Sequence, residues 1–105
     1  MLNPDALSIA DSLDQILTEG KTKGPLFGIP VLLKDNIDTH DKMPTTGGSR
    51  VLKDSFPLTD SWVAKRLRDA GAVILGKTNL SEWANYRASY SSSGWSGVGG
   101  QTKNP

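Results

Sequence analysis

An α/β fold with two parallel strands is predicted by the order in which two kinds of pattern occur along the chain. Short apolar runs at residues 29–33 and 73–75 each follow a segment whose apolar residues recur at helical spacing. Strands that alternate with helices in this way usually pair in parallel. Neither run alternates with polar residues, so each strand is expected to be covered on both faces. Because two strands and two helices cannot provide that cover, the chain is expected to be a piece of a larger α/β domain.

The first helix is expected to begin at Asn3, whose side chain would cap it. Pro4 would lie in the first turn and Asp5 near the positive end of the helix. An apolar stripe with steps of three and four residues then continues to Gly20, where the helix is expected to end. The stripe consists of Ala6, Ile9, Ala10, Leu13, Ile16 and Leu17.

The rest of the chain is expected to hold a long loop, a second helix and a Ser/Gly-rich end. Residues 35–58 show no sustained period, and loops of that length are usually functional or disordered. Residues 78–86 are expected to form a short capped helix. The second helix is expected to have Thr59, Asp60 or Ser61 as its cap, Val63, Leu67 and Ala70 on one face, and Gly71 at its end.

Composition and charge exclude several classes of function. The 105 residues carry a formal net charge of +1 and scattered basic residues, so nucleic acid is not expected as a partner. The sequence has no cysteine, and His40 is its one histidine, so no metal site is expected. No apolar run approaches the about 20 residues of a membrane span, and no targeting segment is found. We therefore expect no membrane association, with a cytoplasmic location as the default.

Residues 71–78, GAVILGKT, match the pattern GxxxxGK[ST] of phosphate-binding loops. In such loops the glycine-rich turn follows a strand, and the lysine and Ser/Thr begin a helix. Here the four intervening residues are themselves expected to form the strand. The match is therefore interpreted as coincidental.

Lys34 directly follows the first apolar run, at the carboxyl end of a strand, where the sites of α/β proteins gather. Partial removal from water would disfavour its charged form and make the neutral amine available as a general base. The alternative is that its stem covers apolar surface while the ammonium stays in water.

The tract SSSGWSGVGG, residues 91–100, has three interpretations. A nucleophile loop would need a nearby base and backbone donors for an oxyanion. A flexible linker would lack a large apolar residue such as Trp95. An ordered binding loop would use its glycines for unusual backbone angles and Tyr90 and Trp95 as anchors. Chemistry favours the binding loop and leaves the other two open.

Three blocks of the sequence resemble the amidase signature family. They are GPLFGIPVLLKDNID at residues 24–38, DAGAVILGKTNLSEWA at 69–84 and SSSGWSGVGGQTKNP at 91–105. The last block is most similar to the branch that contains bacterial peptide amidases. The A subunit of aminoacyl-tRNA amidotransferases, an alternative subfamily, shares the lysine block. The resemblance implies a mixed sheet with helices on both faces, with residues 1–105 as the incomplete N-terminal portion of a single domain.

The same resemblance implies hydrolysis of carboxamide C–N bonds by a Ser-cis-Ser-Lys triad without a cofactor. Lys34 matches the family's lysine, the base toward a bridging serine, and backbone N–H groups would hold the oxyanion. In the family both serines follow the stretch that matches QTKNP, residues 101–105, so they are expected beyond the last residue. The chain alone is therefore expected to be inactive.

Other roles follow from the resemblance. Asp35 and Asn36 are expected to support the site, while Tyr90, Ser91, Ser92 and Trp95 are expected to contact the substrate. The partner of the complete enzyme would be a small-molecule or peptide amide. A second hypothesis is a non-catalytic, truncated fragment for interaction or assembly, and exposed sheet edges would allow self-association.

Overall fold

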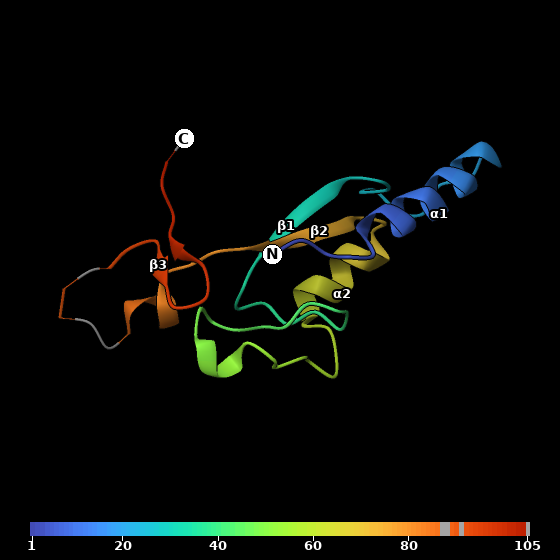
Figure 1. The fold of residues 1–105 in the computed structure, drawn as a ribbon. Coiled ribbons are helices and arrows are strands. Elements are labelled where there is room, and N and C mark those ends of the chain that lie inside the picture. The colour runs from blue at the N-terminus through green and yellow to red at the C-terminus, as the bar shows by residue number, and fades with distance from the viewer. Residues whose placement is uncertain (87–88, 91, 105) are drawn as a thin grey trace.

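The computed structural model describes residues 1–86, 89–90 and 92–104. Figure 1 shows α1 at one end of an elongated molecule and a small hairpin at the other, with a pair of strands between them. The elements, in chain order, are α1 (Ala6–Thr18), β1 (Pro30–Lys34), the 3₁₀ turn η1 (Arg50–Leu52), α2 (Trp62–Asp69), β2 (Val73–Thr78), the turn η2 (Glu82–Asn85), β3 (Trp95–Ser96) and β4 (Gly100–Gln101). No helix within these described ranges is long and apolar enough to cross a lipid bilayer.

The two apolar runs form a parallel pair, as the sequence predicts. β1 and β2 pair from Pro30 opposite Val73 to Lys34 opposite Thr78, with one irregularity between Val31 and Leu32. The carboxyl ends of both strands therefore meet at the same edge of the sheet. Loops that begin there are brought together even though more than forty residues separate them.

The first three residues lie along the other edge of β2, which sequence analysis missed. Leu2 forms an antiparallel bridge with Gly76. The amide of Lys77 donates to the carbonyl of Met1 at 2.8 Å, and the amide of Asn3 donates to the carbonyl of Leu75 at 2.9 Å. β2 thus has a parallel neighbour on one side and an antiparallel one on the other, which makes the pairing mixed.

Helix α1 is present, but its start differs from the prediction. It begins at Ala6, with Asp5 at the N-cap position and no side-chain cap. Asn3 lies two residues before that position. Its side-chain oxygen accepts from the amide of Asp5 at 3.1 Å, and its side-chain nitrogen donates to the carbonyl of Ile74 at 2.8 Å, which holds the N-terminus on β2. The predicted stripe faces the sheet only in part, since Ala6 is buried whereas Leu17 is exposed.

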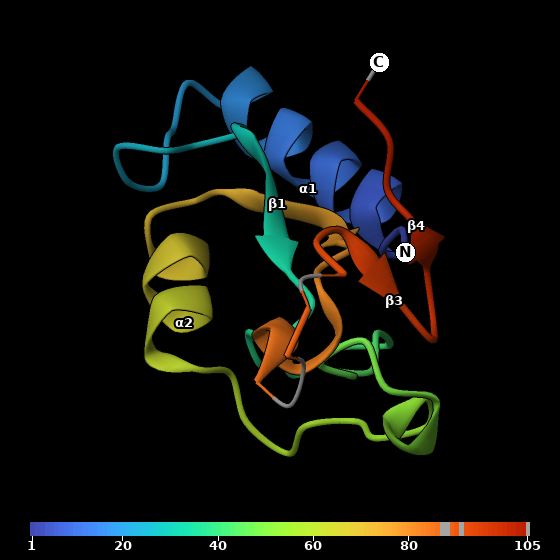
Figure 2. The ribbon, with the colours of Figure 1, turned by 90° about the vertical axis from the view of Figure 1, so that its left-hand side faces the viewer.

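Helix α2 follows Ser61, one of the three predicted caps, whose hydroxyl accepts a hydrogen bond from the amide of Ala64. Figures 1 and 2 show α1 and α2 on opposite sides of β2. Val63, predicted on the apolar face, is exposed, and Ala64 is buried instead. The core consists of Leu33, Met43, Ala64 and Ile74, with Val31, Ile37 and Leu67 packed against it.

β1 lacks cover on both faces in this chain, as the sequence predicts for a piece of a larger domain. β2 is mostly buried, but Ile29, directly before β1, and Leu32 on β1 are 50% and 54% exposed. The reason is that both helices contact β2, which leaves β1 as the outer strand.

The prediction of a short helix over residues 78–86 is wrong. Trp83, Ala84 and Asn85 all have positive φ, so η2 is a left-handed turn rather than the start of an α-helix. Tertiary hydrogen bonds account for it: the amide of Trp83 donates to the carbonyl of Gly47, and Ser81 accepts from Gly94 instead of capping a helix.

The long stretch 35–58 is ordered, and ion pairs attach it to α2. The guanidinium of Arg68 lies 2.7 Å from the carboxylate of Asp41 and 3.0 Å from that of Asp60, and all three side chains are largely shielded from water. The carboxylate of Asp60 also accepts from the amide of His40 at 2.7 Å.

Replacement of Gly71 by alanine is expected to destabilise the fold more than the same change at Gly20. Both glycines have positive φ, which costs an L-residue about 1–2 kcal/mol. A Cβ on Gly71 would also overlap the carbonyl oxygen of Lys23, whereas one on Gly20 would meet nothing within 4 Å. We expect Gly71→Ala to lower the free energy of unfolding by about 3 kcal/mol and Gly20→Ala by about 1 kcal/mol, measured by urea titration. Equal losses would contradict the contact between residues 23 and 71.

Candidate functional site

The candidate site lies where β1 and β2 end. Lys34 and Thr78 are opposite each other at the last position of the ladder. The amide of Asp35 donates to the carbonyl of Thr78 at 3.1 Å, so the chain leaving β1 stays attached to β2 for one residue more. Asn79 then starts the connection to the Ser/Gly-rich tract. This edge therefore joins the three blocks that the sequence analysis singled out.

Asp35 is buried and holds the part of the loop that precedes η1. Its carboxylate accepts hydrogen bonds from the amide of Thr46, at 3.2 Å, and from the hydroxyl of the same residue. Its carbonyl accepts from the amide of Gly47 at 2.8 Å. Asn36, the other predicted supporting residue, is exposed. Asp35 thus anchors residues 46–47 directly beside Lys34.

Lys34 is exposed, so the expected partial desolvation of its ammonium is not found in this chain. Within residues 1–86, 89–90 and 92–104, its side chain makes no hydrogen bond or ion pair. The physical reason is the outer position of β1, over whose end no described element folds back. The catalytic role of Lys34 stays a prediction.

Lys77, rather than Lys34, is the buried lysine of this edge. Its side chain is enclosed, with the residue 3% exposed, and its ammonium donates to the hydroxyl of Thr45 at 2.6 Å and to the carbonyl of Pro44 at 3.2 Å. Burial lowers the pKa of Lys77, and the negative charge of Asp35 opposes that shift in part. Sequence reasoning missed this, although Lys77 follows an apolar run just as Lys34 does.

The position of Lys77 also decides how GAVILGKT is interpreted. Residues 73–78 form β2, so the lysine and threonine of the pattern lie in a strand and not at the start of a helix. The ammonium faces groups of the protein itself. The interpretation of the match as coincidental is confirmed by this geometry.

The Ser/Gly-rich tract is ordered in its described part, and Asn79 organises it. Ser96 is buried, and its hydroxyl lies 2.6 Å from the side-chain oxygen of Asn79. The side-chain nitrogen of Asn79 lies within hydrogen-bonding distance of the carbonyls of Gly94 and Gly100 and of the hydroxyl of Thr102. The short antiparallel pair β3–β4 lies between these contacts. The linker interpretation is therefore wrong for this part of the tract.

Asn79 and Ser96 were not predicted as important residues. Asn79 follows the strand within GKTN, and a polar residue directly after a buried strand was the available signal. Ser96 had no distinguishing signal among the neighbouring serines, because burial depends on the return of the chain to Asn79.

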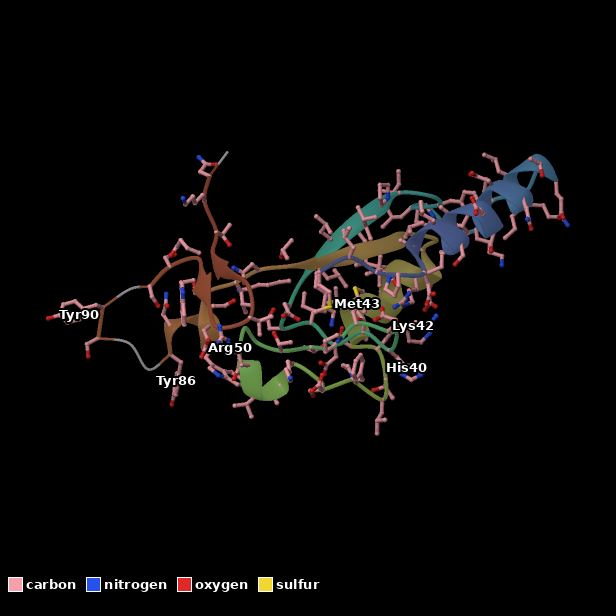
Figure 3. The ribbon with its side chains drawn as sticks, in the orientation of Figure 1. His40, Lys42, Met43, Arg50, Tyr86 and Tyr90 are labelled. Carbon is pink, nitrogen blue, oxygen red and sulfur yellow. The ribbon has the colours of Figure 1, made fainter. Side chains whose placement is uncertain are left out.

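The predicted substrate-contacting residues are spread along the loop. Tyr90 is 90% exposed and lies at the outer tip of the loop in Figure 3, far from the strand pair. Ser92 donates to the side-chain oxygen of Asn85 at 3.0 Å, and Trp95 is 44% exposed on β3. Ser91 lies outside the described residues. The structure brings Asp35 next to Lys34 but, among the residues it describes, forms no enclosed pocket that joins Lys34 to these side chains.

A shallow hollow of 420 Å³ is lined by Gly97 and Val98 of the tract and by Arg50 and Lys53. The guanidinium of Arg50 donates to the carbonyl of Gly97 at 2.6 Å, so this cation serves to hold the tract. In the part of the chain that the structure describes, no three His, Asp or Glu side chains are grouped so that they could hold a metal ion.

Comparison with known proteins gives consistent matches over the whole chain. The model of the family described as Amidase matches residues 1–105. A putative amidase of Schizosaccharomyces pombe is 50% identical over 104 residues, which cover 99% of this chain and 18% of the relative. The A subunit of a glutamyl-tRNA(Gln) amidotransferase from Acidothermus cellulolyticus is 44% identical over 100 residues, which cover 95% of this chain and 19% of the relative.

Among solved structures, native peptide amidase from Stenotrophomonas maltophilia superposes with a TM-score of 0.93 at 56% identity. The match covers 99% of this chain and 21% of that one. The predicted fold is confirmed by this agreement. The chain spans about a fifth of the length of the proteins that it matches.

Asn79→Asp is expected to loosen the tract, because a carboxylate cannot donate to the carbonyls of Gly94 and Gly100. We expect the amide of Thr102, which donates to Gly94, to exchange with solvent about tenfold faster in the variant. Hydrogen exchange followed by NMR measures this. Asn36→Asp, the same change at an exposed asparagine, serves as the control. Equal exchange in the two variants would contradict the organising role of Asn79.

The buried ammonium of Lys77 predicts a pH dependence of stability. Burial lowers its pKa below the ordinary lysine value of 10.5, so between the lowered value and 10.5 the unfolded chain binds more protons than the folded one. The free energy of unfolding of the wild type should therefore rise with pH through this window relative to that of Lys77→Met. Urea titrations at a series of pH values, at fixed protein concentration, measure it.

Lys65→Met is the control for that titration, because Lys65 is exposed and pairs with Asp69 on the surface of α2. This variant should keep the slope of the wild type. A Lys77→Met protein with the same slope as the wild type would contradict the assigned burial of the charge.

Proposed function

Because this chain belongs to the amidase family, we propose that it provides the lysine base of a carboxamide hydrolase whose two serines lie outside residues 1–105. The observation that carries the proposal is the placement of Lys34. It lies at the carboxyl end of β1, paired with the end of β2, and next to the anchored Asp35. Polar side chains at that edge of an α/β sheet are where sites of this fold class form.

The proposed mechanism uses the neutral amine of Lys34. A nucleophilic serine attacks the carbonyl carbon of the amide, and its proton passes through a bridging serine to Lys34. The same proton returns through the bridging serine to the leaving amine when the C–N bond breaks. Water then hydrolyses the acyl ester by the same relay, while backbone N–H groups hold the oxyanion.

An amine in water is protonated at neutral pH and cannot accept that proton. The ammonium of Lys34 would lose its proton more readily if it were removed from water, and the exposed apolar surface beside it is a place where other residues could pack. Leu32, two positions before Lys34 on β1, lies on the same face of the strand and is 54% exposed. We propose that residues outside the described chain cover this face in the complete enzyme and remove Lys34 from water.

The proposed substrate is a small-molecule or peptide amide, with Tyr90, Ser92 and Trp95 on the loop that would contact it. The name of the peptide amidase that superposes on the chain supports the peptide class. The amidotransferase subunit that also matches supports a related amide chemistry.

A second candidate is a non-catalytic fragment for interaction or assembly. The outer edge of β1, with Ile29 and Leu32 exposed, favours it, because an unpaired strand edge with apolar neighbours binds other strands. In that role the same edge would also drive self-association of the chain.

Reconstitution separates the two candidates. The chain is mixed with a complementary segment of the Stenotrophomonas maltophilia peptide amidase, chosen to include the stretch after the matched part, where the family resemblance implies both serines. We expect ammonia release from a peptide amide by the mixture and none by the chain alone. Lys34→Ala and Lys34→Arg should each lower the rate about 10²–10⁴-fold, because neither side chain can act as a base.

Lys21→Ala is the control, since Lys21 is exposed and pairs only with the nearby Glu19 among the described residues. A stable complex without turnover would favour the assembly role. Hydrolysis by the chain alone that disappears in Lys34→Ala would overturn the proposal that the serines lie outside it.

A further inference from the structure

Lys77, the lysine of the GAVILGKT match, has no role in the proposed mechanism, and the match itself is coincidental. It is a buried cation beside a proposed active site, and buried cations are rare unless their hydrogen bonds are satisfied. Both backbone polar groups of Lys77 bind Met1, since its amide donates to the carbonyl of Met1 at 2.8 Å and its carbonyl accepts from the N-terminal ammonium at 3.0 Å. The side chain therefore leaves β2 from a fixed point.

The contacts of Lys77 continue to Lys34 through a short chain of neighbours. The ammonium binds the carbonyl of Pro44 and the hydroxyl of Thr45. The next residue, Thr46, donates its amide and its hydroxyl to the carboxylate of Asp35. Asp35 follows Lys34 directly and donates its own amide back to Thr78.

These contacts close a ring that begins and ends on adjacent residues of β2. The ring passes through residues 77, 45, 46, 35 and 78, and Lys34 is the residue directly before its member Asp35. Electrostatics reinforce it, because the carboxylate of Asp35 attracts the ammonium of Lys77. Loss of the contact between Lys77 and Thr45 would loosen residues 44–47, although the amide of Thr45 would still donate to the carbonyl of Ser55.

We propose that Lys77 is a positioning residue for Lys34, holding residues 44–46 against Asp35 and thereby fixing the backbone from which the base projects. The inference rests on the proposed function, in which Lys34 is the base. Lys77 does not itself reach substrate in this arrangement, because its donors are turned to Pro44 and Thr45 and its side chain is enclosed.

The first test uses hydrogen exchange to measure whether the ring holds residues 46 and 47, and it needs no enzymatic activity. Thr45→Val removes the hydroxyl that Lys77 binds and keeps the shape of the side chain, whereas Thr45→Ser keeps the hydroxyl. We expect the amides of Thr46 and Gly47 to exchange about tenfold faster in Thr45→Val and at the wild-type rate in Thr45→Ser. The amide of Val73, a buried residue of β2 that donates to the carbonyl of Ile29, reports on wider unfolding and should stay unchanged.

Lys77→Met should show the same local change, and if this variant fails to fold, Thr45→Val alone decides. Unchanged exchange at Thr46 and Gly47 in a folded Thr45→Val protein would overturn the proposed anchoring.

The second test uses the reconstituted hydrolase. A displaced base stabilises the transition state less well but does not change substrate binding. Thr45→Val should therefore lower kcat about tenfold or more and leave KM unchanged. Thr45→Ser should restore kcat, and Lys65→Met, a surface lysine, should not change it.

The outcomes separate the two proposals. If Lys34→Ala keeps full hydrolysis, the proposed function fails whatever the exchange data show. If Lys34→Ala abolishes hydrolysis but Thr45→Val and Lys77→Met keep the wild-type kcat, Lys34 is the base and its positioning by Lys77 is overturned.

Discussion

The parallel pairing of β1 with β2 is the interaction on which the rest of the structure depends. It places Lys34 opposite Thr78, so that two loops distant in sequence start side by side. The pairing is held by contacts on the other side of β2 as well, where the first residues of the chain add an antiparallel bridge. A strand with neighbours on both edges and a helix on each side is a rigid support, whereas β1 depends on β2 alone among the described elements.

Buried polar groups organise the loop that connects β1 to α2. Asp35, Thr46 and Lys77 are all buried, and among the described residues every buried side-chain nitrogen or oxygen has a partner. Such groups are costly to bury singly, but together they satisfy one another and define one conformation of the loop. The loop is therefore ordered by hydrogen bonds and ion pairs, with Met43 as its main apolar contribution to the core.

Asn79 has the same function for the Ser/Gly-rich tract. Small residues allow the tract to approach this side chain closely, since a Cβ on Gly99 would overlap the side-chain oxygen of Asn79. The serines and glycines that suggested a nucleophile loop thus act, where described, as a close-packed support at the end of β2. Tyr90 extends from that support into solvent, on the part of the loop farthest from the strands.

Local pattern by itself determined the two strands, the two helices and the place of Lys34 at a strand end, because periodicity and short apolar runs report backbone conformation directly. The family blocks added the fold and the amidase relationship. Burial was decided only by tertiary structure. IPVLLK and AVILGK look alike as sequences, yet Lys34 is exposed and Lys77 enclosed, because the N-terminal segment and both helices gather on β2. The left-handed turn at residues 83–85 and the contacts of Asn79 were likewise decided by partners from distant residues, which no local pattern contains.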